Sequence, residues 1–346
     1  MNQRELPRPP HYDPAGVGQI WHPDTQALAA AAGTWRDRFG LNPASEDGRR
    51  IAMLLVDVQN SFCTPGFELF VAGRSGSGAV DDNRRLCDFL YRHVGIISQI
   101  TATMDTHFPY QVFHPSFWID AEGQHPAPFT QVSSGDIESG RWSVDPEASA
   151  AIGIELDYLQ RYVRHYTHTL ETGGKYDLTI WPYHVLLGSP GHALVSSVQE
   201  AVFFHTLARR VQPVFHVKGD NPLTEHYSVL GPEVTTDPEG NEISSKDTSF
   251  VDQLLGFDRI VVAGQAKSHC LAWTISDLLE SIELRDRRLA EKVYLLEDCT
   301  SPVVVPGAFD YTEEADEAFR RFERAGMKVV RSAEPMDEWP GVGILT

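Results

Sequence analysis

Six short apolar runs alternate along the chain with segments whose apolar residues recur at helical spacing. We expect strands at 51–57, 99–105, 211–217, 259–264, 292–298 and 327–331. We expect helices at 81–94, 192–209, 270–284 and 312–325. Continuous apolar strands separated by helices are typical of parallel sheets that are covered on both faces. The pattern therefore predicts an α/β fold with a doubly wound, mostly parallel six-stranded sheet in three layers.

Two segments fall outside this alternation. Prolines at positions 7, 9, 10 and 14 forbid regular helix near the N-terminus, after which Thr25 can cap a helix that ends at Phe39. Between 119 and 180 a Ser/Gly-rich loop is followed by a helical stretch that begins at Pro146. We therefore expect an N-terminal arm at 1–48 and one domain at 49–346 with a helical insertion at about 119–180.

The composition disfavours several classes of partner. The net charge is −19, with only 29 Lys and Arg, so the basic surface needed for phosphate backbones is absent. We expect neither nucleic acid nor membrane as a partner. The four cysteines stand far apart without CxxC spacing, which predicts free thiols in a reducing compartment. The chain shows no apolar secretory signal and no run long enough to span a membrane, so we expect a soluble, cytoplasmic protein.

Chemically capable side chains stand where four of the expected strands end. They are Asp57, Asp105 with His107, Lys218 and Cys270. In an open α/β sheet, ligands bind outside the carboxyl ends of the strands. An acid, a lysine, a thiol and a possible metal pair should therefore converge there, which predicts an enzyme.

Three of these residues form a candidate catalytic constellation. Cys270 begins an expected helix, where the dipole and free N–H groups favour a thiolate and lower the thiol pKa. Asp57 ends a run too apolar for an uncompensated carboxylate, and Lys218 would hold that acid ionised. Taken singly, each has an ordinary role, as a buried hydrophobe, a turn cap and a surface lysine. Their occurrence together on three strand ends favours catalysis.

Five stretches resemble the isochorismatase-like cysteine hydrolases, and most closely their nicotinamidase branch. They are DVQNSFCTPGFEL (57–69), MDTHFPYQVFHPSF (104–117), WPYHVLLGSPGHAL (181–194), VKGDNPLTEHYS (217–228) and VAGQAKSHCLAWT (262–274). The resemblance implies a Rossmann-like three-layer fold, with Asp57 as the base, Lys218 beside it and Cys270 as the nucleophile. It also implies a cis peptide between Gln265 and Ala266, with the backbone N–H groups of Ala266 and Cys270 as the oxyanion hole.

The same resemblance implies a metal site and an aromatic pocket. The metal would be held by Asp105, His107 and His184, a set of one carboxylate and two imidazoles that suits zinc, with iron or manganese as alternatives. Phe62 and Trp181 would sandwich a pyridine ring, and Tyr227 would line the pocket. Without the resemblance, the first three could be turn and loop residues and the aromatic ones simply core. Further histidines that flank the motifs, and that we do not expect to be ligands, are His114, His192, His226 and His269.

The expected activity is hydrolysis of a small carboxamide, nicotinamide or a related aromatic amide, to the acid and ammonia through a thioester. WPYHVLL lacks the cysteine that often follows the metal histidine in nicotinamidases, and AKSHC introduces Lys267 and His269 near the nucleophile, so the substrate stays open. The alternatives are hydrolysis of another amide or carbamoyl compound (maleamate, biuret or a ureido acid) without a metal, vinyl-ether hydrolysis of an isochorismate-like substrate, and a non-catalytic binding module. We expect a small-molecule amide as substrate and a homo-oligomeric assembly.

Overall fold

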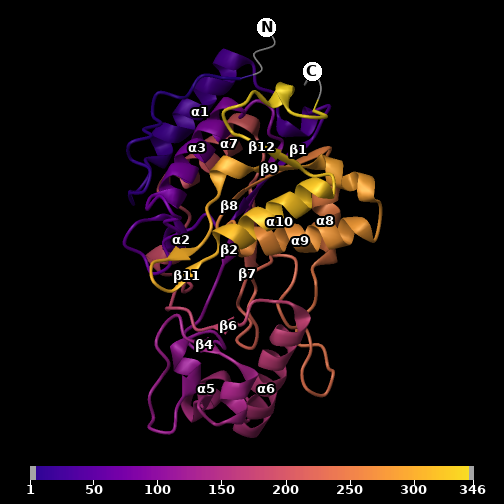
Figure 1. Ribbon diagram of the computed structural model, residues 1–346. Helices are drawn as coiled ribbons and strands as arrows, with labels where there is room; N and C mark the ends of the chain where they lie inside the picture. The colour runs from indigo at the N-terminus through magenta and orange to yellow at the C-terminus, as the bar shows by residue number, and fades with distance from the viewer. Residues whose placement is uncertain (1–4, 343–346) are drawn as a thin grey trace.

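A parallel sheet forms the centre of the computed structural model, which describes residues 5–342 (Figure 1). The sheet has six strands in the order β12-β9-β8-β1-β2-β7, and every pairing is parallel. The strands are β1 (Ile51–Val56), β2 (Gln99–Asp105), β7 (Val214–Lys218), β8 (Arg259–Gly264), β9 (Val293–Leu296) and β12 (Lys328–Val330). The predicted doubly wound α/β fold is confirmed, and the strand order reverses between β1 and β8.

Helices cover both faces of this sheet. On one face lie α1 (Thr25–Phe39), α3 (Gly78–Arg92) and α7 (Ser196–Arg209), and on the other α8 (Thr248–Leu255), α9 (Cys270–Glu283) and α10 (Thr312–Arg324). Alternate residues of β1 enter the two cores, Met53 and Leu55 on the first face and Leu54 and Val56 on the second. Because both faces are buried, β1 is apolar without interruption, which is why it is recognisable in the sequence.

The expected bounds of two elements shift for local reasons. The strand expected at 211–217 begins at Val214, because Arg210 ends α7 in a left-handed conformation and Pro213 has no N–H to donate. The helix in the N-terminal arm is capped by Asp24 rather than Thr25, since the Asp24 carboxylate accepts the Ala27 N–H at 3.0 Å. The sequence analysis also left out α8, which follows directly on a polar segment.

The insertion forms a separate lobe of short elements, seen around α5 and α6 in Figure 1. It comprises β3 (Trp118–Ile119), β4 (Gln131–Val132), α4 (Ser134–Glu138), β5 (Ser143–Val144), α5 (Pro146–Ile152), α6 (Leu156–Gly173) and β6 (Leu178–Thr179). The helical stretch expected from Pro146 is divided, because Gly153 adopts φ 76° and ends α5. The apolar stripe of α6, including Leu159, Val163 and Leu170, is buried in the core.

The remaining elements are short. They are α2 (Asn60–Cys63), β10 (Val304–Val305), β11 (Phe309–Asp310) and the 3₁₀ turns Ala44–Glu46, Pro115–Phe117, Pro190–His192, Arg287–Lys292, Glu297–Cys299 and Met336–Glu338. All four cysteines are buried and free, as predicted. In the part of the chain that is described, no helix combines the length and apolar character needed to cross a membrane.

Candidate active site

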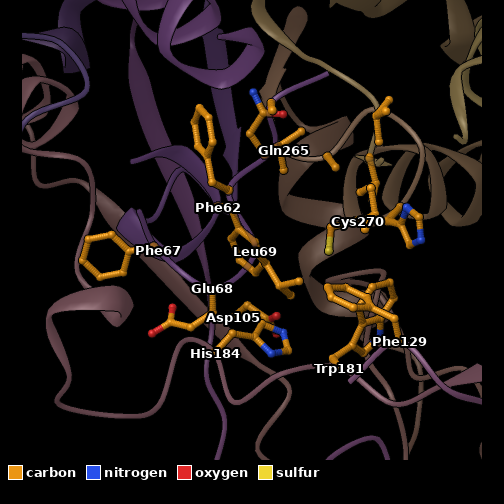
Figure 2. A pocket seen from close by; sticks show the side chains of 18 of the residues that line it. Phe62, Phe67, Glu68, Leu69, Asp105, Phe129, Trp181, His184, Gln265 and Cys270 are labelled. Carbon is orange, nitrogen blue, oxygen red and sulfur yellow. The ribbon is translucent and has the colours of Figure 1, made fainter. Parts of the chain in front are cut away.

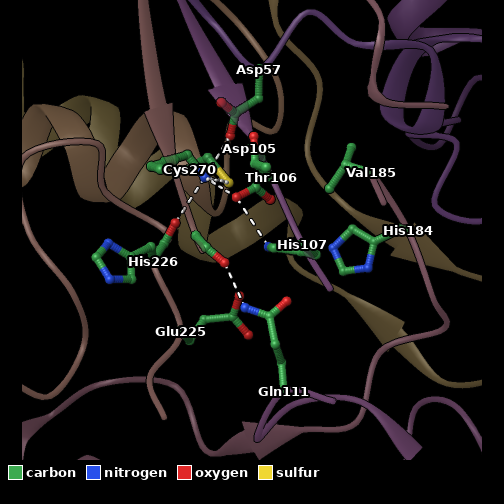
Figure 3. Close-up of polar contacts among 12 residues, drawn as sticks. Asp57, Asp105, Thr106, His107, Gln111, His184, Val185, Glu225, His226 and Cys270 are labelled. Atoms are coloured by element: carbon green, nitrogen blue, oxygen red, sulfur yellow. Dashed lines mark hydrogen bonds and ion pairs between the residues drawn. The ribbon is translucent and has the colours of Figure 1, made fainter. Parts of the chain in front are cut away.

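Three elements that end or begin at the carboxyl ends of the sheet strands bring Asp57, Lys218 and Cys270 into contact. Asp57 follows β1, Lys218 ends β7 and Cys270 begins α9. The Lys218 Nζ lies 2.9 Å from the Asp57 Oδ2 and 3.7 Å from the Cys270 Sγ (Figure 3). The three residues are only 0%, 4% and 8% exposed, in that order. The structure therefore joins the three strand-end residues that the sequence analysis singled out.

Each member of this group is held by further contacts. The Asp57 N–H donates to the Thr103 Oγ1 at 2.9 Å, and the Thr103 hydroxyl donates back to the Asp57 carboxylate. The Lys218 Nζ also contacts the Asp105 Oδ1 at 2.9 Å and donates to the His226 carbonyl oxygen at 2.8 Å. Burial opposes the charge on Lys218, but the two carboxylates outweigh it and hold the Lys218 pKa well above its usual value.

The electrostatics of Cys270 differ from the expectation. Cys270 does begin a helix, yet burial raises its thiol pKa well above the usual value, and the nearby Asp57 and Asp105 carboxylates add to the rise while Lys218 opposes it. Loss of solvation thus outweighs the favourable dipole, and the resting form is the thiol. Burial likewise raises the Asp57 pKa, against the opposing effect of Lys218. A thiol beside a strengthened base is suited to proton transfer within the site.

The segment between β8 and α9 has the backbone needed for an oxyanion site. The peptide bond between Gln265 and Ala266 is cis. Gly264 has φ 126°, and a Cβ there would lie 2.1 Å from the Val56 carbonyl oxygen, so only glycine fits where β8 passes β1. Cys270 is the first residue of α9, and its N–H therefore has no acceptor within the helix.

A cluster of buried histidines lies beside Asp105. One ring nitrogen from each of His107, His114 and His184 lies within 4.8 Å of the others. The Nδ1 atoms of His114 and His184 face the carbonyl oxygens of Phe108 and Pro182 at 3.0 and 2.8 Å. A carbonyl accepts a hydrogen bond, so these Nδ1 atoms carry the proton and each Nε2 keeps its lone pair. The arrangement fits a divalent metal.

Other features of the histidine cluster agree with metal binding. Burial lowers the pKa of His114 to about 3 and that of His184 well below its usual value, so both rings are neutral, as ligands must be. The Nδ1 of His107 lacks a hydrogen-bond partner among the described residues. Asp105 lies beside the three histidines and is not part of their group. Its Oδ1 contacts the His107 Nε2 at 3.1 Å and also the Lys218 Nζ.

His114, which was not expected to be a ligand, lies in the histidine cluster. The usable signal was its position seven residues after His107 in the same loop, which the D-x-H motif alone does not include. Of the other flanking histidines, His192 contacts the Thr106 hydroxyl at 2.8 Å, and His226 contributes its carbonyl to Lys218. Neither belongs to the histidine cluster.

A cavity of about 260 Å³ connects Cys270 with the histidine cluster (Figure 2). Cys270 and His184 both line it, so one ligand can touch both. Phe62, Trp181 and Tyr227, the three expected pocket residues, are also in its wall, and the Trp181 Nε1 donates to the Tyr227 hydroxyl at 3.2 Å. The lining residues that the sequence analysis did not predict include Phe67, Leu69, Phe129, Glu225 and the segment 303–306.

Two residues that depart from the nicotinamidase pattern occupy different surroundings. Lys267 points away from the cavity and pairs with Asp316 at 2.7 Å. His269 lines the cavity, and its ring packs against Trp181 and Tyr227 at centroid distances of 5.8 and 5.2 Å. The departure at His269 can therefore affect the substrate, whereas the departure at Lys267 affects packing.

Comparison with known proteins adds independent support for the fold and shows which proteins the chain is similar to. No protein-family model matches the chain. The nicotinamidase of Escherichia coli (strain K12) is 26% identical over 229 residues, which span 66% of this chain and 76% of that protein. The yeast nicotinamidase Pnc1p has a TM-score of 0.50 at 16% identity, over 81% of this chain and 99% of that chain, which shows a shared fold. The chain is therefore similar in sequence to a nicotinamidase and shares the fold of another.

Proposed function

We propose that the protein hydrolyses a small aromatic carboxamide, with nicotinamide as the first candidate, to the carboxylic acid and ammonia. The observation that carries this proposal is the contact of Cys270, Asp57 and Lys218 at one end of a cavity with aromatic walls. The names of the Escherichia coli and yeast relatives support the choice of substrate.

The geometry supports a thioester mechanism. Asp57 accepts the thiol proton of Cys270, both of which lie against the Lys218 ammonium, and the sulfur attacks the amide carbonyl. The N–H groups of Ala266 and Cys270 stabilise the resulting oxyanion. Asp57 then gives the proton to the amide nitrogen, which leaves as ammonia. In the second half, Asp57 accepts a proton from water as the water oxygen attacks the thioester, and the acid and the free thiol are released.

The cluster of His107, His114 and His184, with Asp105 beside it, would hold a divalent metal. Zinc is the first expectation for imidazole ligands, with iron or manganese as alternatives. When bound, the metal would supply a Lewis-acid contact that orients a heteroatom of the substrate ring. Lys218 contributes separately, because it holds the Asp105 and Asp57 carboxylates in place from the opposite side.

The charges in the cavity wall favour a neutral substrate. Among the described residues, no lysine or arginine lines the cavity, whereas the acidic residues Glu68, Asp105 and Glu225 do. The Lys218 ammonium is already engaged by two carboxylates. In the metal-free alternative, a maleamate or a ureido acid would bring its own carboxylate into this wall without a cationic partner, which costs binding energy. We therefore favour an uncharged aromatic amide over those alternatives.

Ammonia release from nicotinamide, pyrazinamide and maleamate by the purified protein tests the proposal, with metal content measured on the same sample. We expect hydrolysis of the two aromatic amides and little of maleamate. The variants Cys270→Ala and Cys270→Ser should keep the fold and lose at least about 10³-fold in kcat, because neither side chain can supply the thiolate. Retained turnover by C270A would remove the thioester, and a preference for maleamate would remove the aromatic substrate.

A further inference from the structure

The insertion reaches the cavity through one side chain. Among its described residues, Phe129 is the one that lines the cavity. Figure 2 shows its ring beside Trp181, below the sulfur of Cys270. The two ring centroids are 6.1 Å apart, and the ring planes meet at 89°. A segment outside the core of the fold thus contributes to the space in which a substrate ring must lie.

The backbone fixes Phe129 in this position. Phe129 has φ 70°, a left-handed conformation that a non-glycine residue adopts only where its surroundings enforce it. Its N–H donates to the Ile180 carbonyl at 2.5 Å, and the Ile180 N–H donates to the Thr130 carbonyl at 2.8 Å. The pairing continues directly into β4 and β6. Because Trp181 follows Ile180 in the chain, these bonds lock the two aromatic residues relative to each other.

We propose that Phe129 is a specificity-determining residue that limits the substrate to a single six-membered ring. This inference rests on the proposed amide hydrolysis, and it concerns how large a substrate the same cavity can accept. A planar ring stacked on Trp181 meets the perpendicular Phe129 at its rim, so a fused second ring on that side collides with Phe129. The insertion therefore narrows the range of amides that reach Cys270.

Replacing Phe129 should leave the contacts among Asp57, Lys218 and Cys270 unchanged, because none of the interactions described for these three residues involves the Phe129 side chain. The test compares nicotinamide with quinoline-3-carboxamide, which is nicotinamide with a fused benzene ring. We expect Phe129→Ala to raise kcat/KM for the bicyclic amide relative to nicotinamide by at least about tenfold, since one misfitting group in an apolar pocket changes discrimination by roughly 10–200-fold. Phe129→Gly should do the same, and it also removes the left-handed strain.

A matched control separates the pocket from the insertion as a whole. Tyr158→Ala removes an aromatic ring from α6 of the same insertion, outside the cavity, where its hydroxyl contacts Asp237 at 3.1 Å. This variant should leave the ratio of the two kcat/KM values unchanged. Melting curves of all variants check the fold.

An unchanged ratio in both folded Phe129 variants would overturn the inference, while nicotinamide hydrolysis by the wild type would still support the proposed function. If the wild type releases ammonia from neither amide, the proposed function fails by itself. Calorimetric titration then tests the size limit by measuring the Kd of each amide for the wild type and for F129A. The same ratio of the bicyclic Kd to the nicotinamide Kd in both proteins would overturn the inference.

Discussion

At the scale of single residues, Lys218 is the side chain that links the charged groups of the site. Its ammonium contacts the buried carboxylates of Asp57 and Asp105 at 2.9 Å each. Two carboxylates so close together would not both stay ionised without a cation between them. The lysine thus stabilises the ionised form of Asp57, which its proposed role as a base requires. It can do so because β7 ends beside β2, where the Asp105 and Lys218 positions pair directly.

We therefore predict that Lys218→Met destabilises the protein by roughly 3–5 kcal/mol, the usual cost of leaving buried charges unpaired. Activity should fall by at least about 10²-fold, because Asp57 would then hold its proton. Urea unfolding and ammonia release measure the two effects. The control is Lys267→Met, which should cost less because its partner Asp316 is 42% exposed. Equal effects of the two variants would contradict this role for Lys218.

At the scale of elements, the histidine cluster depends on two loops that backbone hydrogen bonds join. His107 and His114 lie in the loop after β2, and His184 lies in the loop after β6. The His107 N–H donates to the Val185 carbonyl at 3.2 Å, and the Leu187 N–H donates to the His107 carbonyl at 3.1 Å. These bonds fix the second loop against the first, so the three rings meet although 77 positions separate the first from the last.

At this scale we predict that His114→Ala weakens metal binding by more than the roughly 10–100-fold cost of losing an outer-shell partner. Metal content after dialysis, measured by elemental analysis, should fall relative to the wild type. Addition of a chelator should lower the melting temperature of the wild type and change H114A little. His165→Ala is the control, because His165 contacts the Thr236 carbonyl outside the cluster. Full metal retention by H114A would exclude it as a ligand.

At the scale of the whole molecule, the sheet brings the reactive groups together at the carboxyl ends of its strands, and the insertion reaches them. The arm packs α1 against α7 on one face, with Leu28, Ala32 and Trp35 buried. The insertion supplies Phe129 to the cavity. The homo-oligomeric assembly and the cytoplasmic location stay predictions, which sedimentation and cell fractionation would test.

Burial of neutral histidines should make the whole fold sensitive to acid. Burial lowers the pKa of His205, on α7, to about 4, helped by the nearby Arg209, although the Ile97 carbonyl partly offsets the effect. Below pH 6.5, His205 binds a proton in the unfolded chain but stays neutral in the folded chain. Its contribution to the free energy of unfolding is therefore full above that pH and falls between about pH 6.5 and 4. This one group should lower the free energy of unfolding by about 2 kcal/mol at pH 5.

Urea unfolding at pH 7 and pH 5 measures this loss. His205→Gln removes the titrating ring and should make the difference between the two pH values smaller by about the same 2 kcal/mol. A pH dependence identical to that of the wild type would show that His205 does not contribute.

The sequence by itself determined the sheet and the three reactive residues at its edge. Apolar runs, helical spacing and the side chains at strand ends are local properties, so Asp57, Lys218 and Cys270 were recognisable before any contact was known. Only the tertiary structure decided what surrounds them. His114 joins the histidine cluster, Phe129 reaches the cavity and burial raises the Cys270 pKa. These outcomes depend on the paths of the loops in the folded chain and on how much solvent the loops exclude. No short pattern along the sequence encodes either property.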